Sequence, residues 1–384
     1  MGDKRPGVST TAANYGGTAV RWEPGFLCSG EEFGSFWAGM GSEEPKRRGL
    51  LIAGRGFDPR TVHGPRALAT AAFPIVECCL IRLTNPQDSP DRPRNLAAAT
   101  NEAEMRELLG NATFEVKEVA VRDANGRLVG SSQTRALFAD EGWLCGFTDI
   151  VVDITALPTS INFPLLGTLI AAYDNLAGQG APAFNLHCIV CENADLDEHI
   201  VSEGGDVADY IDPFRGRGGL TAEAEPITIW TPVLGERQSA VLRKIYEMLG
   251  PAETKPVLPF PSRNPRRGDA LVAEYHSLLF DTWEVDPGGF LYADERDPFD
   301  IYRQIGDLAA EYRRSLEPLG VANTVVSAHT SKVLSLGILL AAFEHSLAVA
   351  HVEPTGYSLD EEVVNMDANE LFEVWLTGEA YVAT

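Results

Sequence analysis

Basic residues, cysteines and long apolar runs are all scarce in this chain of 384 residues. Lys and Arg together number 31 against 55 Asp and Glu, so the formal net charge at pH 7 is −24. Proteins that bind nucleic acid without regard to sequence depend on a basic surface. The charge balance therefore argues against broad nucleic-acid binding, but it leaves room for a small basic pocket that holds one phosphorylated ligand.

No apolar run approaches the ~20 residues that a membrane-spanning helix needs. The first six residues lack the apolar core of a signal peptide, and most of the six cysteines lie in apolar runs, as expected for reduced, buried thiols. Cys188 and Cys191 form a CxxC, but residues i and i+3 of a strand point to opposite faces, which disfavours a shared zinc ion. We expect a cytoplasmic protein without a cofactor, and the ligand-type residues between 187 and 199 leave a divalent metal open.

Motifs of the common hydrolases are also missing. The sequence contains no GxSxG, HExxH or GxxxxGK[ST], so serine hydrolases, zincins and P-loop NTPases lose their most direct support. Instead, β-branched runs alternate with helical patterns along the chain, which favours doubly wound parallel sheets. The predicted fold class is α/β, with two Rossmann-like lobes whose sheets are mainly parallel, preceded by an arm rich in Gly and aromatic residues.

The predicted domain boundaries follow shifts in composition. They are an arm over 1–48, a first lobe over 49–203, a Gly-rich linker over 204–226, a second lobe over 227–357 and a carboxyl-terminal strand and tail over 358–384. The arm is expected to pack on the body or on a partner, and the tail to form an edge strand.

Polar loops follow predicted strands in both lobes, where a doubly wound sheet binds its ligands. The first lobe would contribute Arg55, Asp58, Arg60, Asp153 and Thr155 to a phosphate site. The second lobe would contribute Arg263, Arg266, Arg267, Thr330, Ser331 and Lys332. For the loop 54–60, the local sequence slightly favours the alternative, an internal Arg–Asp pair that only holds the loop.

The stretch 323–343 begins as a β-branched run, turns at residues 327–329 and continues as an apolar helix. Free N–H groups and the helix dipole favour an anion at such a helix start. Lys332 is the wrong charge for that position, which suggests an anionic partner; a lysine that reaches out to water is the alternative.

The turn His329-Thr330-Ser331-Lys332, followed by Leu336-Gly337 and Leu340-Ala341-Ala342, resembles the Gly-Gly-Thr-Lys turn and Ala-rich helix of CARF domains. The resemblance covers about twenty residues, and His329 stands where that family prefers glycine. CARF domains are Rossmann-like sensors of cyclic oligonucleotides in prokaryotic defence. The resemblance implies a parallel sheet, often in a pair of lobes, with ligand phosphates bound at strand ends.

Three functions follow as hypotheses. The first is a sensor or regulatory subunit of an antiphage-type defence system, which binds a nucleotide or cyclic oligonucleotide and acts through a partner subunit or a homo-oligomer. The second is a nucleotide-processing hydrolase or phosphodiesterase with His329 and Asp297 as acid–base groups, although Asp297 could be only a helix cap and His329 a core histidine. The third is a non-catalytic scaffold subunit of a larger complex.

Overall fold

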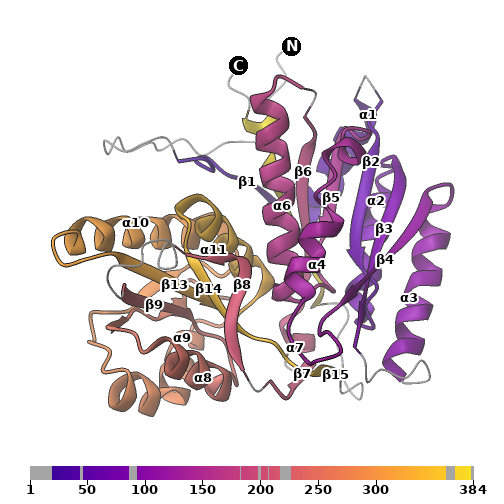
Figure 1. Ribbon diagram of the computed structural model, residues 1–384. Helices are drawn as coiled ribbons and strands as arrows, with labels where there is room; N and C mark the ends of the chain where they lie inside the picture. Colours follow the sequence, from indigo (N-terminus) through magenta and orange to yellow (C-terminus); the bar gives the residue numbers. More distant parts are fainter. Residues whose placement is uncertain are drawn as a thin grey trace.

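The computed structural model describes residues 20–43, 46–85, 93–181, 183–197, 200–205, 207–216, 226–359 and 368–381. Two α/β lobes lie side by side, one from the indigo-to-magenta part of the chain and one from the orange part (Figure 1). Each lobe contains a seven-stranded sheet that is mainly parallel, as the alternation of strand and helix patterns predicts. The fold class expected from the sequence is confirmed.

The first sheet has the order β1-β16-β6-β5-β2-β3-β4, in which β2 to β6 are parallel. Its strands are β1 (Phe26–Ser29), β2 (Gly49–Gly54), β3 (Ile75–Thr84), β4 (Thr113–Ala120), β5 (Asp149–Asp153), β6 (Asn185–Glu192) and β16 (Glu370–Thr377). The helices of this lobe are α1 (Glu31–Ser42), α2 (His63–Thr70), α3 (Pro93–Leu109), α4 (Gly130–Leu137), α5 (Glu141–Leu144) and α6 (Thr159–Gly178), with 3₁₀ turns at Pro59–Val62 and Glu379–Tyr381.

The second sheet has the order β12-β11-β9-β13-β14-β8, with β10 paired to β9. Its strands are β8 (Ala208–Arg215), β9 (Ile227–Val233), β10 (Glu253–Thr254), β11 (Val257–Pro259), β12 (Leu291–Ala293), β13 (Ala322–Ala328) and β14 (Ala348–Val352). The helices are α8 (Ser239–Leu249), α9 (Arg267–Glu274), α10 (Pro298–Leu316) and α11 (Lys332–His345), with a π-helical turn at Ser277–Thr282. Five central strands of each sheet follow the same order, β4-β3-β2-β5-β6 in the first lobe and β12-β11-β9-β13-β14 in the second. When these five are numbered along the chain, the order is 3-2-1-4-5 in both, and it reverses beside strand 1, which is β2 or β9.

The lobes exchange their outer strands. β8 follows the first lobe in the chain but pairs antiparallel with β14, and β16 follows the second lobe but pairs antiparallel with β6. Between the lobes lie α7 (Ala194–Asp197) and a two-stranded sheet of β7 (Ile200–Glu203) and β15 (Gly356–Leu359) (Figure 1). The segment 204–226, expected to be a linker, supplies β8 to the second sheet. The segment 358–384, expected to form an edge strand, supplies β16, which lies inside the first sheet between β1 and β6. Each of these strands gives hydrogen-bond partners to the backbone of a sheet that would otherwise end there. Residues 217–225 and 360–367 lie outside the described part of the chain.

The aromatic arm packs on its own chain. Trp22, Phe33 and Trp37 are buried, the indole Nε1 of Trp22 donates to the carbonyl of Leu376 at 2.8 Å, and β1 pairs with β16. These three aromatic side chains are therefore not available to a partner subunit. The first 19 residues of the arm lie outside the described residues.

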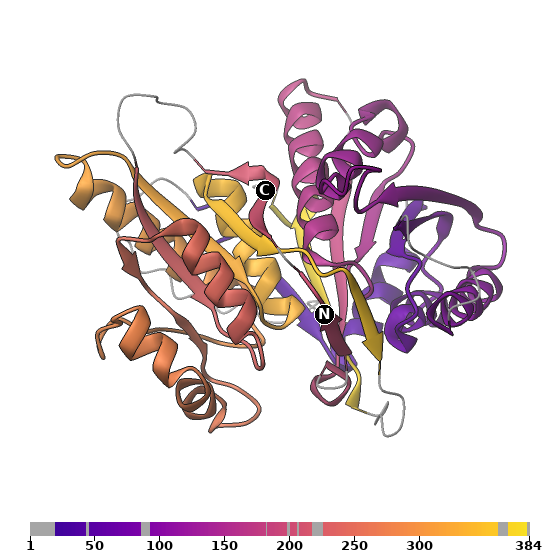
Figure 2. The ribbon, with the colours of Figure 1, turned by 60° about the horizontal axis from the view of Figure 1, so that its bottom comes forward.

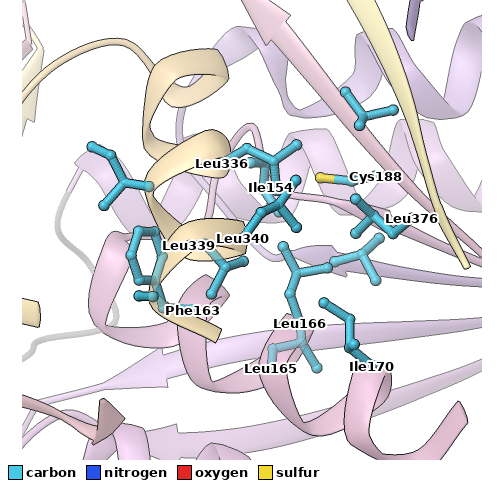
Figure 3. Close-up of a cluster of buried hydrophobic side chains, with 14 of the residues drawn as sticks. Ile154, Phe163, Leu165, Leu166, Ile170, Cys188, Leu336, Leu339, Leu340 and Leu376 are labelled. Carbon is cyan, nitrogen blue, oxygen red and sulfur yellow. The ribbon is translucent and has the colours of Figure 1, made fainter. Parts of the chain in front are cut away.

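One hydrophobic core runs through both lobes. Helix α11 is apolar around its whole circumference, which is typical of a buried helix. Its residues Leu336, Leu339 and Leu340 lie against Leu165 and Leu166 of α6 (Figure 3). The lobes therefore share their interior. Among the described residues, each helix is too short or too polar to cross a membrane.

Candidate functional site

The carboxyl ends of the central strands of both lobes open onto one cavity of about 610 Å³. The loops after β2 and β5 line it from the first lobe, and those after β9 and β13 line it from the second. These are the two places where the strand order reverses, and the volume is within the range of small-molecule sites. Ile200 and Gly356, from the small sheet between the lobes, also line the cavity. That sheet lies at the bottom of Figure 1, the side that Figure 2 brings forward.

The cavity wall is more basic than the rest of the chain. Among the described residues, nine Arg and Lys side chains but only six Asp and Glu side chains line it, whereas acids outnumber bases over the whole sequence. The basic lining residues are Arg55, Arg60, Arg82, Arg94, Arg237, Arg263, Arg267, Arg296 and Lys332. An acidic protein thus gathers basic side chains around one cleft, and the carboxylates that pair with them decide how much of that charge is left for an anionic ligand.

Most of the arginines expected at the site are already neutralised by carboxylates. The buried Arg60 donates to Asp58 at 2.7 Å and pairs with Asp197 at 2.8 Å. Arg267 pairs with Glu236 and Glu295. Arg55 pairs with Glu102, and Arg263 pairs with Glu370. The internal Arg–Asp pair that the sequence left open at 54–60 is therefore present, and these charges hold loops together.

Lys332 differs from these arginines. Ser331 caps α11 by accepting from the amide of Leu334, and the Nζ of Lys332 donates to the carbonyl of Leu157 in the first lobe at 2.7 Å. Burial lowers the pKa of Lys332, and the nearby positive charge of Arg60 lowers it further. Among the described residues, no carboxylate forms an ion pair with this ammonium group. The negative charges of Asp197, Glu192 and Asp58 raise the pKa of Lys332 in turn, so these carboxylates act on the ammonium group from a distance and not through an ion pair.

The start of α11 holds a carboxylate that the sequence interpretation did not assign to it. The Oε1 atom of Glu192, at the end of β6, accepts from the amide of Val333 at 2.8 Å. Burial raises the pKa of Glu192, and the negative charge of Asp197 raises it further. The expected affinity of this helix end for an anion is thus met in part by the protein itself. In the sequence, the signal for this contact was the charged Glu192 at the end of an otherwise buried strand.

Two further polar groups of this turn lack hydrogen-bond partners among the described residues. The Nε2 atom of His329 and the Oγ1 atom of Thr330 are buried, and neither has a hydrogen-bond partner within the described residues. The ring of His329 stacks on His351 with centroids 5.7 Å apart and planes inclined by 5°. Burial, with a smaller contribution from His351, lowers the pKa of His329 to about 3. His329 is therefore neutral at physiological pH and is unsuited to donate a proton as a general acid.

Matching the last paired residues of the central strand pair in each lobe sets up a correspondence between the two lobes. Asp153 lies opposite Ala53, and Ala328 lies opposite Val233 in the same central strand pair. Two residues further on, Thr155 is the counterpart of Thr330. The Oγ1 of Thr155 accepts from the amide of Cys191 at 2.9 Å, whereas the Oγ1 of Thr330 has no partner in the described part of the chain.

Three residues expected at the site lie elsewhere. Asp153 is buried behind the wall, where its Oδ1 accepts from the amide of Thr155 at 2.9 Å. Arg266 is exposed and does not line the cavity. Asp297 caps α10 by accepting from the amide of Phe299 at 2.8 Å, which is its helix-cap interpretation. Among the described residues, no group of three His, Cys, Asp or Glu side chains is arranged to hold a metal ion.

The comparisons with known proteins do not assign this chain to a family. No family model matches the sequence, and no curated protein matches it. Among solved structures, a chain described as "GsuK channel bound to NAD" is 11% identical, with a TM-score of 0.17 over 86% of this chain and 77% of that chain. A TM-score this low carries no argument about fold or function.

Proposed function

We propose that the cleft between the lobes binds a nucleotide or another ligand with several phosphates, and that the protein acts as its sensor. The observation that carries this proposal is the set of unsatisfied groups at the turn after β13. His329, Thr330 and Lys332 all line the cleft. The Nε2 of His329 and the Oγ1 of Thr330 are buried without a hydrogen-bond partner among the described residues, and the Nζ of Lys332 donates to the carbonyl of Leu157. Buried polar groups without partners cost free energy, so a ligand that satisfies them is stabilised.

The resemblance of the turn 329–332 to CARF domains makes a cyclic oligonucleotide the preferred ligand and a prokaryotic defence system the preferred context. The alternative of a nucleotide-processing enzyme has less support. Its two acid–base candidates are a neutral histidine with a strongly lowered pKa and a helix cap that does not line the cavity. A sensor that does not turn over its ligand would act through a partner subunit or a second copy of the chain.

A thermal-shift panel tests the proposal. Mononucleotides, dinucleotides and cyclic oligonucleotides are added to the wild type, to Lys332→Ala and to Arg266→Ala. A ligand at ~100 times its dissociation constant should stabilise the wild type by about 2.7 kcal/mol. We expect Lys332→Ala to lose that shift and Arg266→Ala, which removes a basic side chain outside the cavity, to keep it.

A shift in the wild type that survives in Lys332→Ala would contradict the assignment of Lys332. A flat panel with a correctly folded wild type would contradict nucleotide binding itself. Analysis of the ligand after incubation then separates the two classes, because a sensor returns its ligand unchanged, whereas a hydrolase or phosphodiesterase converts it.

A further inference from the structure

Phe57 is an aromatic residue in an unusual position. It lines the cavity, is partly buried, and belongs to none of the three buried hydrophobic clusters formed by the described residues. Phe372, the other phenylalanine of the cavity wall, is buried in the core and has the guanidinium of Arg296 5.2 Å from its ring. Because it is only partly buried and lies outside these clusters, Phe57 stays partly accessible at the cavity wall.

The backbone on both sides of Phe57 is held firmly. The Nδ2 atom of Asn101, on α3, donates to the carbonyls of Gly56 and Asp58, at 3.0 Å each. On the other side, a Cβ added to Gly56 would come within 2.5 Å of the Cβ of Ala156, so only glycine allows this loop to lie so close to the loop after β5. The side chain of Asp58 then caps the following 3₁₀ turn by accepting from the amide of Arg60. The loop therefore presents Phe57 from a fixed support.

The position of Phe57 complements that of Lys332. Phe57 lies in the loop after β2 of the first lobe, and Lys332 lies after β13 of the second, on the same cavity. Asp58 and Arg60, which follow Phe57 directly, are close enough to Lys332 for their charges to influence its pKa. An aromatic residue of the first lobe and a lysine of the second thus line one cavity whose volume suits a nucleotide.

We infer that Phe57 is a stacking platform for a nucleobase, so that the base of the ligand lies on the first lobe and its phosphates lie toward Lys332 of the second. Every nucleobase has a flat face that stacks on an aromatic ring, and a rigid platform loses little freedom when it does so. This inference rests on the proposed function. The proposed function puts the phosphates of a nucleotide at the turn 329–332, and the inference puts the base of the same nucleotide on Phe57.

The test compares ligands with and without a base. Tripolyphosphate, ATP and a cyclic oligoadenylate are titrated calorimetrically into the wild type, Phe57→Ala, Phe57→Trp and Lys332→Ala. Tyr292→Ala is the matched control, since Tyr292 is an exposed aromatic residue outside the cavity wall. We expect at least one adenine-containing probe to bind the wild type more tightly than tripolyphosphate. Phe57→Ala should weaken that probe about 5- to 150-fold and leave the affinity for tripolyphosphate unchanged.

Phe57→Trp and Tyr292→Ala should keep the preference for adenine, and Lys332→Ala should weaken all probes together. Melting temperatures confirm that each variant is folded. If nucleotides bind but Phe57→Ala keeps the full preference for adenine, the inference is wrong and the proposed function stands. If none of the three probes binds the wild type, the proposed function fails for these probes and the platform fails with it.

Discussion

The two lobes have the same strand order but use their equivalent positions differently. In the first lobe, Asp153 and Thr155 are engaged by neighbouring amides, and the arginines around them are paired with carboxylates. In the second lobe, the counterparts are the apolar Ala328 and the unpartnered Thr330, followed by Lys332. Positive charge near a strand end is therefore weak evidence for an anion site by itself. What distinguishes the turn after β13 is that two of its polar atoms, the Nε2 of His329 and the Oγ1 of Thr330, have no hydrogen-bond partner among the described residues, although both residues line the cavity beside Lys332. The hydroxyl of Thr155, in contrast, is used by the fold.

The same contrast holds inside the sheets. His187 of β6 lies opposite Val151, and the equivalent pair of the second lobe is Val349 opposite Val326. His187 is fully buried, and its Nδ1 is 2.7 Å from Glu373 Oε1. The first lobe thus buries a histidine, in an ionisable pair with Glu373, at a sheet position where the second lobe has a valine. The following predictions test this difference between the two lobes.

Arg60→Ala should have the largest effect, because it leaves the buried Asp58 without its partner. Removing one member of a buried ion pair costs about 3–5 kcal/mol of the free energy of unfolding. Urea unfolding measures this loss, and Arg266→Ala, at an exposed site, should change it by less than about 0.5 kcal/mol. Normal stability combined with lost nucleotide binding would instead make Arg60 a ligand residue and remove the contrast between the lobes.

Leu340→Ala tests whether the lobes are one cooperative unit despite their different chemistry. Leu340 is fully buried in the cluster that spans both lobes (Figure 3). A Leu→Ala change in such a core costs about 2–5 kcal/mol. Calorimetry should show a single transition at a lower temperature. Two transitions, of which only one moves, would show that the lobes unfold separately.

Asp153→Asn should stabilise the protein above pH 6. Burial raises the pKa of Asp153 to about 6, against the hydrogen bonds from Thr155 that lower it. A raised pKa in the folded state gives stability at low pH that is lost as the pH rises through 6, by up to about 3 kcal/mol. The variant should match the wild type near pH 4 and exceed it at pH 7–8 in urea unfolding. A variant that is less stable at pH 8 would show that the carboxylate is needed in its charged form.

Deprotonation of His187 should lower the stability of the protein by less than deprotonation of Asp153 does, and at a higher pH. Burial lowers its pKa, but Glu373 and Asp149 outweigh that effect and raise the pKa to about 8. The stabilisation is complete below pH 6.5 and is lost as the pH rises through 8, by up to about 2 kcal/mol. Unfolding of Asp153→Asn between pH 6.5 and 9 isolates this step, and adding His187→Gln should flatten it. A profile that stays steep with His187→Gln would assign the step to another group.

The sequence predicts the α/β class, the two lobes and the central strands, because β-branched runs and turn residues are local signals. It does not predict the exchange of β8 and β16, since pairing between distant segments leaves no local pattern. Among the site residues, Thr330, Ser331 and Lys332 follow from a strand–turn–helix pattern and do line the cavity. The pairing of Arg60 with Asp58 is a local contact that the sequence offered as an alternative. The neutralisation of Arg55 and Arg267 could not be predicted, because their partner carboxylates lie on other elements and meet them only in the folded chain.

The matched pair Thr155→Val and Thr330→Val tests the division between the lobes most directly. The nucleotide that gives the largest thermal shift with the wild type is titrated calorimetrically into both variants, and their unfolding is measured without it. We predict that Thr330→Val weakens binding several-fold and does not lower stability, because its hydroxyl has no partner in the described residues. Thr155→Val should lose about 1–3 kcal/mol of stability by leaving the amide of Cys191 unpaired, and the folded variant should bind normally. Lost binding in Thr155→Val with normal binding in Thr330→Val would contradict the account.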